Sequence, residues 1–235
     1  MVRIFPLSCT SQIILKEGAR ISSFSQGPGQ SGSISISAAD NLTIFGTTPE
    51  NFDDDSFDKI PHSEPEAGNS GLSGLLSHST SIAPNAGNAG SILIQAVTLH
   101  LVEGGIITAS ATNAGGGNIV ITTSNLLYLR ESKMTTSVAT GKGHGGEITI
   151  SHPQFVVLDK GQIRAQADEG RGGNIRIAAK QFIASFDSLV SASSRLGIDG
   201  EVKIESPEVE LSGVLLILPQ RPTGTPLYCR TNETK

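Results

Sequence analysis

The chain has 235 residues, of which 37% are hydrophobic, 4% aromatic and 17% charged, and it contains 27 glycines and no tryptophan. This composition is poor for a helical bundle and is typical of many short strands joined by glycine-rich turns. The net charge of −5 argues against nucleic acid as a partner, because it leaves no basic surface. The sequence has no run of about 18 apolar residues that could span a membrane as a helix.

The beginning of the chain has one basic residue and a short apolar run, too short for the core of a signal peptide. We interpret residues 1–12 as an N-terminal remnant, because a repeating pattern is already present at Ile13. Cys9 and Cys229 lie near opposite ends of the chain, and two cysteines do not define a disulfide framework. We expect both to be unpaired thiols.

A glycine, then a polar residue, then an Ile-x-Ile pair recurs along the chain. The six copies begin at Gly32, Gly90, Gly117, Gly146, Gly173 and Gly200, and the last has valine in place of its first isoleucine. From Gly90 onward the copies are 27, 29, 27 and 27 residues apart, whereas the first gap is 58 residues. A nearly constant spacing of this kind indicates a repeat protein built from one structural unit.

Two further patterns follow the Ile-x-Ile pairs. An apolar-x-apolar pair comes a few residues later: Leu99 and Leu101, Leu127 and Leu129, Val156 and Leu158, Val209 and Leu211, with a slipped version at Ile183–Phe186. An apolar residue followed two places later by a small one ends most units: Ile107 and Ala109, Met134 and Thr136, Ile163 and Ala165, Val190 and Ala192. Each unit therefore carries three short runs with the period-2 alternation of strands that have one buried face.

Three such strands in each unit predict an all-β fold, a right-handed parallel β-helix (solenoid), over residues 13–218. About seven coils of roughly 27 residues would stack at about 4.8 Å per coil. Inward rows are expected at Ile119, Ile148 and Ile175, and at Ile107, Met134, Ile163 and Val190. The glycines at 115–117, 145–146 and 172–173 should form sharp corners, where we expect positive φ angles.

The long first gap contains one ordinary coil and an insertion. Leu42–Ile44 and Gly74–Ser77 supply two strands of that coil, which leaves residues 46–73 as an acidic insertion loop projecting from a corner. Insertions in solenoids often form the binding face, so its acidic side chains are possible partner contacts: Asp53, Asp54, Asp55, Asp58, Glu64 and Glu66. A mobile solvated loop without a partner is the alternative. Residues 219–235 lose the repeat and are expected to be a C-terminal tail.

The unit Gly-Gly-Asn-Ile-x-Ile, followed by Leu-x-Leu and Gly-x-Ile-x-Ala, resembles the filamentous haemagglutinin family of large exoproteins, above all the repeat arrays of its cyanobacterial members. The resemblance covers about residues 13 to 211, and Asn85–Ile92 is particularly similar to the corners of that family. It implies a right-handed β-helix, two-partner secretion through an outer-membrane transporter, and adhesion to a host-surface or extracellular glycan or protein. A secreted or cell-surface location is expected on the same basis.

The sequence departs from that family at its beginning. A signal peptide and a secretion domain with an Asn-Pro-x-Gly type motif, which such exoproteins carry, do not occur here. We therefore expect this chain to be a C-terminal or truncated piece of a longer exoprotein. Export of the piece itself does not follow from the resemblance.

Parallel β-helices also carry polysaccharide lyases and hydrolases, which need clustered carboxylates on the outer face of neighbouring coils. The outward positions of the first strand hold Ser35, Leu93, Val120, Thr149, Arg176 and Lys203, and those of the second hold His100, Tyr128, Val157, Ala184 and Glu210. No acidic pair is found among them. We predict a non-catalytic protein without a cofactor or metal site, with a carbohydrate-active enzyme as the alternative.

The remaining charged and histidine side chains are interpreted as surface features. Four charges in one unit are expected to form a solvated loop edge: Asp159, Arg164, Asp168 and Glu169. His144 and His152 have no further ligands at metal-binding spacing and should lie on the surface. His78 is expected to cap the insertion.

Overall fold

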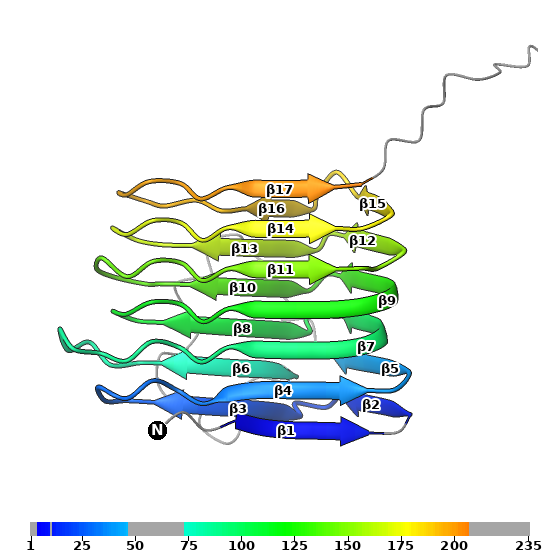
Figure 1. Cartoon of the computed structure of the whole chain (residues 1–235), viewed down its shortest axis with the longest axis horizontal. Coiled ribbons are helices and arrows are strands. Elements are labelled where there is room, and N and C mark those ends of the chain that lie inside the picture. The colour runs from blue at the N-terminus through cyan, green and yellow to red at the C-terminus, as the bar shows by residue number, and fades with distance from the viewer. Residues whose placement is uncertain (1–3, 10, 47–72, 207–235) are drawn as a thin grey trace, which may run out of the picture.

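The computed structural model describes residues 4–9, 11–46 and 73–206. This part of the chain contains seventeen strands and no helix. The paired strands run parallel, and successive turns of the chain stack on one another as the coils of a solenoid (Figure 1). The predicted all-β parallel β-helix with three strands per coil is confirmed, and its right-handedness stays a prediction.

Each coil contributes strands to three faces of the solenoid. The first face stacks β1 (Ile4–Cys9), β4 (Ser33–Ala38), the first part of β7 (Ile92–Val102), the first part of β9 (Ile119–Arg130), β11 (Ile148–Ser151), β14 (Ile175–Ala178) and β17 (Val202–Glu205). The second face stacks β2 (Gln12–Leu15), β5 (Asn41–Phe45), the later parts of β7 and β9, β12 (Phe155–Asp159) and β15 (Gln181–Ala184). The third face stacks β3 (Arg20–Ser25), β6 (Gly74–Ser79), β8 (Ile106–Ala111), β10 (Lys133–Ser137), β13 (Gln162–Gln166) and β16 (Leu189–Ser191).

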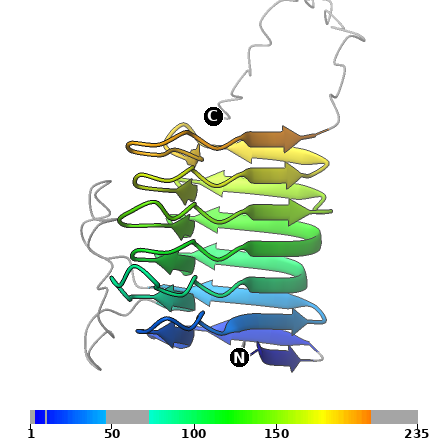
Figure 2. The same ribbon diagram turned by 60° about the vertical axis from the view of Figure 1, so that its left-hand side comes forward.

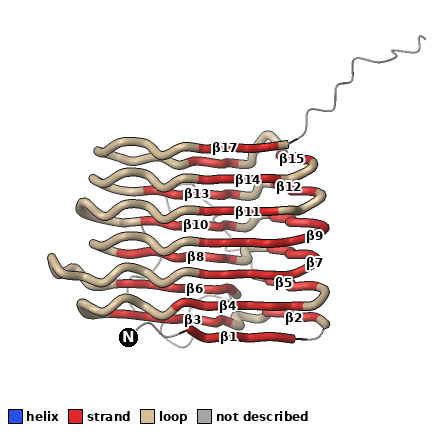
Figure 3. Tube along the Cα trace, in the orientation of Figure 1, coloured by secondary structure: helices blue, strands red, loops and turns tan. Residues whose placement is uncertain are grey.

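These strands make six complete coils and the first strand of a seventh within the described residues. β7 and β9 each continue from the first face to the second without a break. The connections from the third face to the next first face project together from one side of the stack (Figures 2 and 3). The loops that border the third face therefore form a continuous surface along the solenoid.

The first coil begins within the segment interpreted from the sequence as an N-terminal remnant, residues 1–12. β1 pairs with β4 in register, with Ile4 opposite Ser33 and Cys9 opposite Ala38. Backbone pairing thus begins the β-helix at Ile4. This is nine residues before Ile13, where the repeat pattern first becomes recognisable in the sequence. This segment, Ile4–Cys9, lacks the Gly-polar-Ile-x-Ile pattern, so the repeat alone does not reveal the strand.

The insertion leaves the solenoid after Gly46 at the end of β5 and returns at Ser73 before β6. Both ends are buried and bonded to neighbouring coils, since Gly46 N donates to Val102 O and Ser73 O accepts from Ile106 N. The acidic residues predicted as partner contacts all lie outside the described residues: Asp53, Asp54, Asp55, Asp58, Glu64 and Glu66. Residues 207–235, with the expected tail, also lie outside them.

The core consists of side chains stacked in rows along the solenoid. Ile119, Ile148 and Ile175 pair in register and are 0%, 0% and 1% exposed. The second predicted row is confirmed too, with in-register pairing of Ile107, Met134, Ile163 and Val190. Each fully buried isoleucine stabilises the fold by about 1.5–3 kcal/mol relative to an exposed one. A single coil cannot bury these side chains, so stability comes from stacking.

The prediction for the second face of the sixth coil was wrong. The sequence suggested a slipped apolar pair within Ile183–Phe186 with Ala184 outward, but Phe182 pairs with Val156 and Ala184 with Leu158. Ile183 is consequently 52% exposed, and Phe186 lies fully exposed at the corner. Strand register decides which side chains enter the core, and it overrides the size of the apolar residues nearby.

The glycines before the first-face strands are needed for close backbone approach, and the expected positive φ is absent there. A Cβ atom on Gly117, Gly146 or Gly173 would overlap the carbonyl oxygen of the equivalent glycine one coil earlier. Positive φ is found instead at the corner between the second and third faces, on Glu103, Glu131 and Lys160. Glycine is thus selected at these corners by lack of space for a side chain.

Asparagines at the glycine corners connect one coil to the next. Asn118 Oδ1 accepts a hydrogen bond from Glu147 N at 2.9 Å, 29 residues further along the chain. Asn174 Oδ1 accepts one from Glu201 N at 3.0 Å, 27 residues further. The side chains of Asn118 and Asn174 thus replace a backbone acceptor between coils.

Candidate functional site

A groove runs along the solenoid where the third-face strands end and the projecting loops begin. It has a volume of about 550 Å³ and is lined by residues of five successive coils: 78–80, 110–112, 137–140, 166–168 and 193–195. We call this the axial groove. With neighbouring coils about 4.8 Å apart, its five levels span roughly 19 Å.

Strand pairing arranges the residues of the axial groove in rows. The row at the ends of the third-face strands is polar and half-buried, and consists of His78, Ser110, Ser137, Gln166 and Ser193. The next row consists of small side chains. Ala111, Val138 and Ala167, only 4%, 4% and 6% exposed, form an apolar strip in its middle, and Ser79 and Ser194 lie at its two ends. The groove therefore combines a row of hydrogen-bonding groups with a narrow apolar strip.

Hydrogen bonds hold the polar row in place along the axis. Ser137 Oγ donates to Ser110 Oγ at 2.9 Å, and Ser110 Oγ also lies 2.7 Å from Thr108 Oγ1. Gln166 Nε2 donates to Ser193 Oγ at 3.3 Å. A hydroxyl can donate one bond and accept two, so these bonds leave the row able to bind further polar groups.

One end of the axial groove carries an ion pair between neighbouring coils. Arg195 Nε donates to Asp168 Oδ1, and the side chains are 67% and 10% exposed respectively. Ser194 Oγ donates to the carbonyl oxygen of Asp168 at 3.2 Å. The Asp168 carboxylate is thus nearly buried and is paired with a guanidinium group that is mostly exposed to solvent.

Thr112 supplies a buried hydroxyl without a hydrogen-bond partner. The residue lines the axial groove and is 8% exposed, and its Oγ1 makes no hydrogen bond. Buried hydroxyls in folded proteins are nearly always bonded, and an unmade bond costs about 1–3 kcal/mol.

The axial groove contains few ionisable side chains. Among the described residues that line it, Asp168 is the one carboxylate, and it is paired with Arg195. Glycoside hydrolysis generally uses two carboxyl groups, about 5–5.5 Å or 6.5–9.5 Å apart. The described part of the chain also contains no cluster of three or more side chains that could hold a metal ion.

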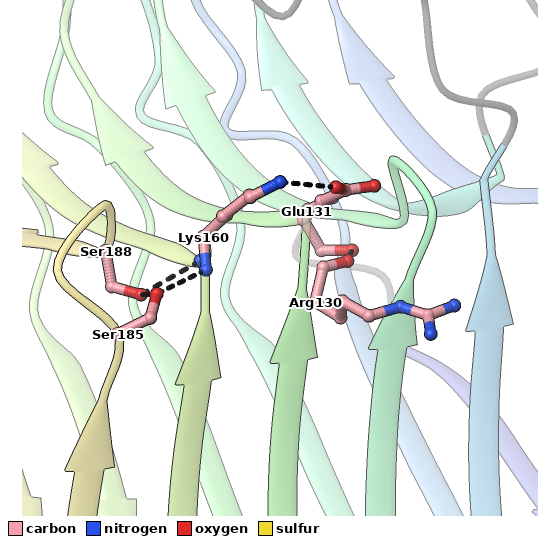
Figure 4. Close-up of polar contacts among 7 residues, drawn as sticks. Arg130, Glu131, Lys160, Ser185 and Ser188 are labelled. Carbon is pink, nitrogen blue, oxygen red and sulfur yellow. Dashed lines mark hydrogen bonds and ion pairs between the residues drawn. The ribbon is translucent and has the colours of Figure 1, made fainter.

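A second polar cluster lies at the corner between the second and third faces (Figure 4). Lys160 Nζ lies 3.2 Å from Glu131 Oε1, and the Lys160 backbone N–H donates to Ser185 Oγ at 2.9 Å. Arg130 pairs with Glu103 at 2.8 Å in the same way. Exposed ion pairs of this kind contribute about 0.2–1 kcal/mol each. The cluster connects neighbouring coils.

The four charges that the sequence placed together are separated in the structure. Asp159 ends β12 at one end of the β13 strand, while Asp168 and Glu169 follow the other end. Asp168 and Arg164 are 9% and 5% exposed, so the expectation of a solvated loop edge was wrong for these two. Glu169 is exposed as expected. The spacing of the repeats predicts which coil a residue belongs to, but it does not predict which corner of that coil the residue occupies.

The four histidines among the described residues occupy three kinds of environment. His144 and His152 are exposed, as predicted, and His144 Nδ1 accepts a hydrogen bond from Arg171 N at 3.0 Å. His100 packs edge-on against Tyr128 on the second face, with ring centroids 5.9 Å apart, and burial lowers the pKa of His100. His78 belongs to the polar row of the axial groove, opposite Ser110.

Comparisons with protein-family models, with curated proteins and with solved structures found no match. In the described residues no helix is long and apolar enough to cross a membrane.

The axial groove was missed from the sequence although its signal was present. A polar residue follows three places after each core residue of the third face, at Ser110, Ser137, Gln166 and Ser193. The third pattern of each repeat comprises the inward apolar residue and the small residue two places later, and it does not include the polar residue that follows. Only the strand register shows that the next position forms a continuous polar row.

Proposed function

We propose that this protein is a non-catalytic, secreted or cell-surface β-helix that acts in adhesion or another surface interaction. The observation that supports this best is the axial groove, which offers repeated hydrogen-bonding groups over five coils and a single, ion-paired carboxylate. A regular surface of this kind suits an extended partner more than a small substrate. The partner is a glycan or protein outside the cell.

The resemblance to filamentous haemagglutinin exoproteins supports the location and the route. Within this proposal the protein belongs to that family and is exported by two-partner secretion, with an outer-membrane transporter as partner of the parent exoprotein. The stacked coils agree with the β-helix that the resemblance implies, but β-helices serve many functions. Detection of the protein on intact cells with an antibody, before and after surface proteolysis, tests the location directly.

Binding and catalysis are separated by measuring both on the same preparations. Labelled protein is incubated with immobilised extracellular polysaccharides and with intact cells, and retained label is measured alongside released reducing ends and unsaturated products. The proposal expects retention without release of products. Product release that disappears in Asp168→Asn would overturn it in favour of a carbohydrate-active enzyme. Retention no greater than that of an unrelated protein of equal charge would overturn the adhesive function.

A further inference from the structure

We infer that the axial groove binds a neutral, linear glycan lying along the solenoid axis. This inference rests on the proposed function and names the ligand class of the same site. The shape of the groove is the first argument. Its lining continues through five coils from His78 to Arg195, so the site is long and narrow, roughly 19 Å in length.

The second argument is chemical complementarity. The polar row presents hydroxyl and amide groups that both donate and accept, as Ser110, Ser137 and Gln166 show in their bonds to one another and to Ser193. Sugar hydroxyls have the same dual capacity. The small side chains of Ala111, Val138 and Ala167 line the groove and are nearly buried, so they leave its width to a ligand.

The charges of the groove favour a neutral ligand. The fixed charges among the described residues of the groove are Asp168 and Arg195, which neutralise each other. The chain as a whole carries a net charge of −5, which repels polyanions at a distance. A neutral glycan pays no such cost, whereas a uronate or sulfate polymer would find one paired arginine and no basic row.

The strand pairing of the third face disfavours a peptide that would bind by adding a strand to the sheet. Peptides bound in extended form to a β-sheet usually pair with an exposed strand edge. β16 ends the third face among the described residues, and the other strands that border the groove, β6, β8, β10 and β13, are each paired on both sides within it. Their backbone groups are therefore used, and a ligand meets side chains alone.

The test is binding of short neutral and charged glycans to the full chain. Probes are maltohexaose, cellohexaose, laminarihexaose and chitohexaose, with hexagalacturonate and an unstructured decapeptide for comparison, measured by calorimetry. Ser137→Phe fills the middle of the groove, and Thr149→Phe places the same side chain on the first face at a half-buried outward position. At least one neutral hexasaccharide should bind, at least tenfold more weakly to Ser137→Phe and within twofold to Thr149→Phe.

A second variant guards against misfolding of the filled groove. The pair Ser110→Ala and Ser137→Ala removes two hydroxyls without adding volume, and it should weaken binding about fivefold or more while the circular dichroism spectrum is unchanged. Neutral probes that do not bind, or that bind Ser137→Phe and Thr149→Phe equally, would overturn the inference. If surface retention persists in that case, the adhesive function stands and only the ligand class fails. If retention is also lost, both fail.

Discussion

The middle coils and the last described strand carry the same Gly-x-Ile-x-Ile type of pattern but bury it to different degrees. On β11, Ile148 and Ile150 are 0% exposed, with β9 and β14 paired on either side. On β17, the equivalent Val202 and Ile204 are 40% and 39% exposed, and β14 is the one strand paired with them among the described residues. The pattern therefore determines which side chains point inward, while burial requires a coil on each side.

The largest effect is expected from a charge placed in the middle of the core. Ile148→Asp buries a carboxylate without a partner between Ile119 and Ile175, and should cost on the order of 4 kcal/mol or more of unfolding free energy. Ile204→Asp should cost about 1–2 kcal/mol, since the site remains partly in water. Urea denaturation followed by circular dichroism gives both values. Equal costs would contradict the difference in burial.

The next effect concerns the glycine corners. A methyl group on Gly146 would overlap the Gly117 carbonyl, so Gly146→Ala should destabilise the protein by about 1–3 kcal/mol. Gly200→Ala overlaps the Gly173 carbonyl in the same way, but β17 is held on one side and can shift, so its cost should be smaller. As a control, Gly29→Ala meets no atom within 4 Å and should change stability by less than about 0.5 kcal/mol. A Gly29→Ala variant as damaging as Gly146→Ala would show that backbone freedom, and not space, selects glycine.

A smaller effect is expected at the asparagines that connect coils. Asn118→Ala removes the acceptor for Glu147 N and should cost about 1 kcal/mol. Asn174→Ala removes the matching bond to Glu201 N, and it should mainly speed amide exchange in β17, because an end strand already opens locally. Hydrogen exchange resolved by residue separates the two outcomes. Similar exchange changes throughout the solenoid in both variants would contradict the idea of a weaker end.

The smallest effect is electrostatic and confined to β17. The Lys203 ammonium and the Arg176 guanidinium, at 2.7 and 2.9 Å, lower the pKa of Glu205 from its ordinary 4.5 to about 2. The contribution of this carboxylate to stability is thus present above about pH 4.5 and is lost as the pH falls toward 2. Carbon-detected titration by NMR should show the low pKa, and Lys203→Met should raise it. A Glu205 pKa that is unchanged in Lys203→Met would refute the pairing.

The sequence predicts the inward residues of this fold because strand alternation and a repeat of 27 or 29 residues each leave a direct trace in it. The sequence does not predict features that depend on contacts between neighbouring coils. The register of Phe182 and Ala184, the contact distance at Gly146 and the polar row through Ser137 depend on what lies one coil away. The site predicted on the acidic insertion lies outside the described residues and stays a prediction.

The central claim is that residues one repeat apart lie side by side on neighbouring coils, and a disulfide tests it most directly. Thr149 pairs with Arg176, and Arg176 with Lys203, so Thr149 and Lys203 lie two coils apart, at about 9.6 Å. In a background of Cys9→Ser and Cys229→Ser, the pair Thr149→Cys and Arg176→Cys should oxidise to an intramolecular disulfide, because Cα atoms about 4.8 Å apart are within bonding range. The pair Thr149→Cys and Lys203→Cys should stay reduced under the same dilute conditions, as judged by mass spectrometry of non-reduced peptides. Cross-linking of the second pair as readily as the first, or of neither pair, would contradict the stacked solenoid.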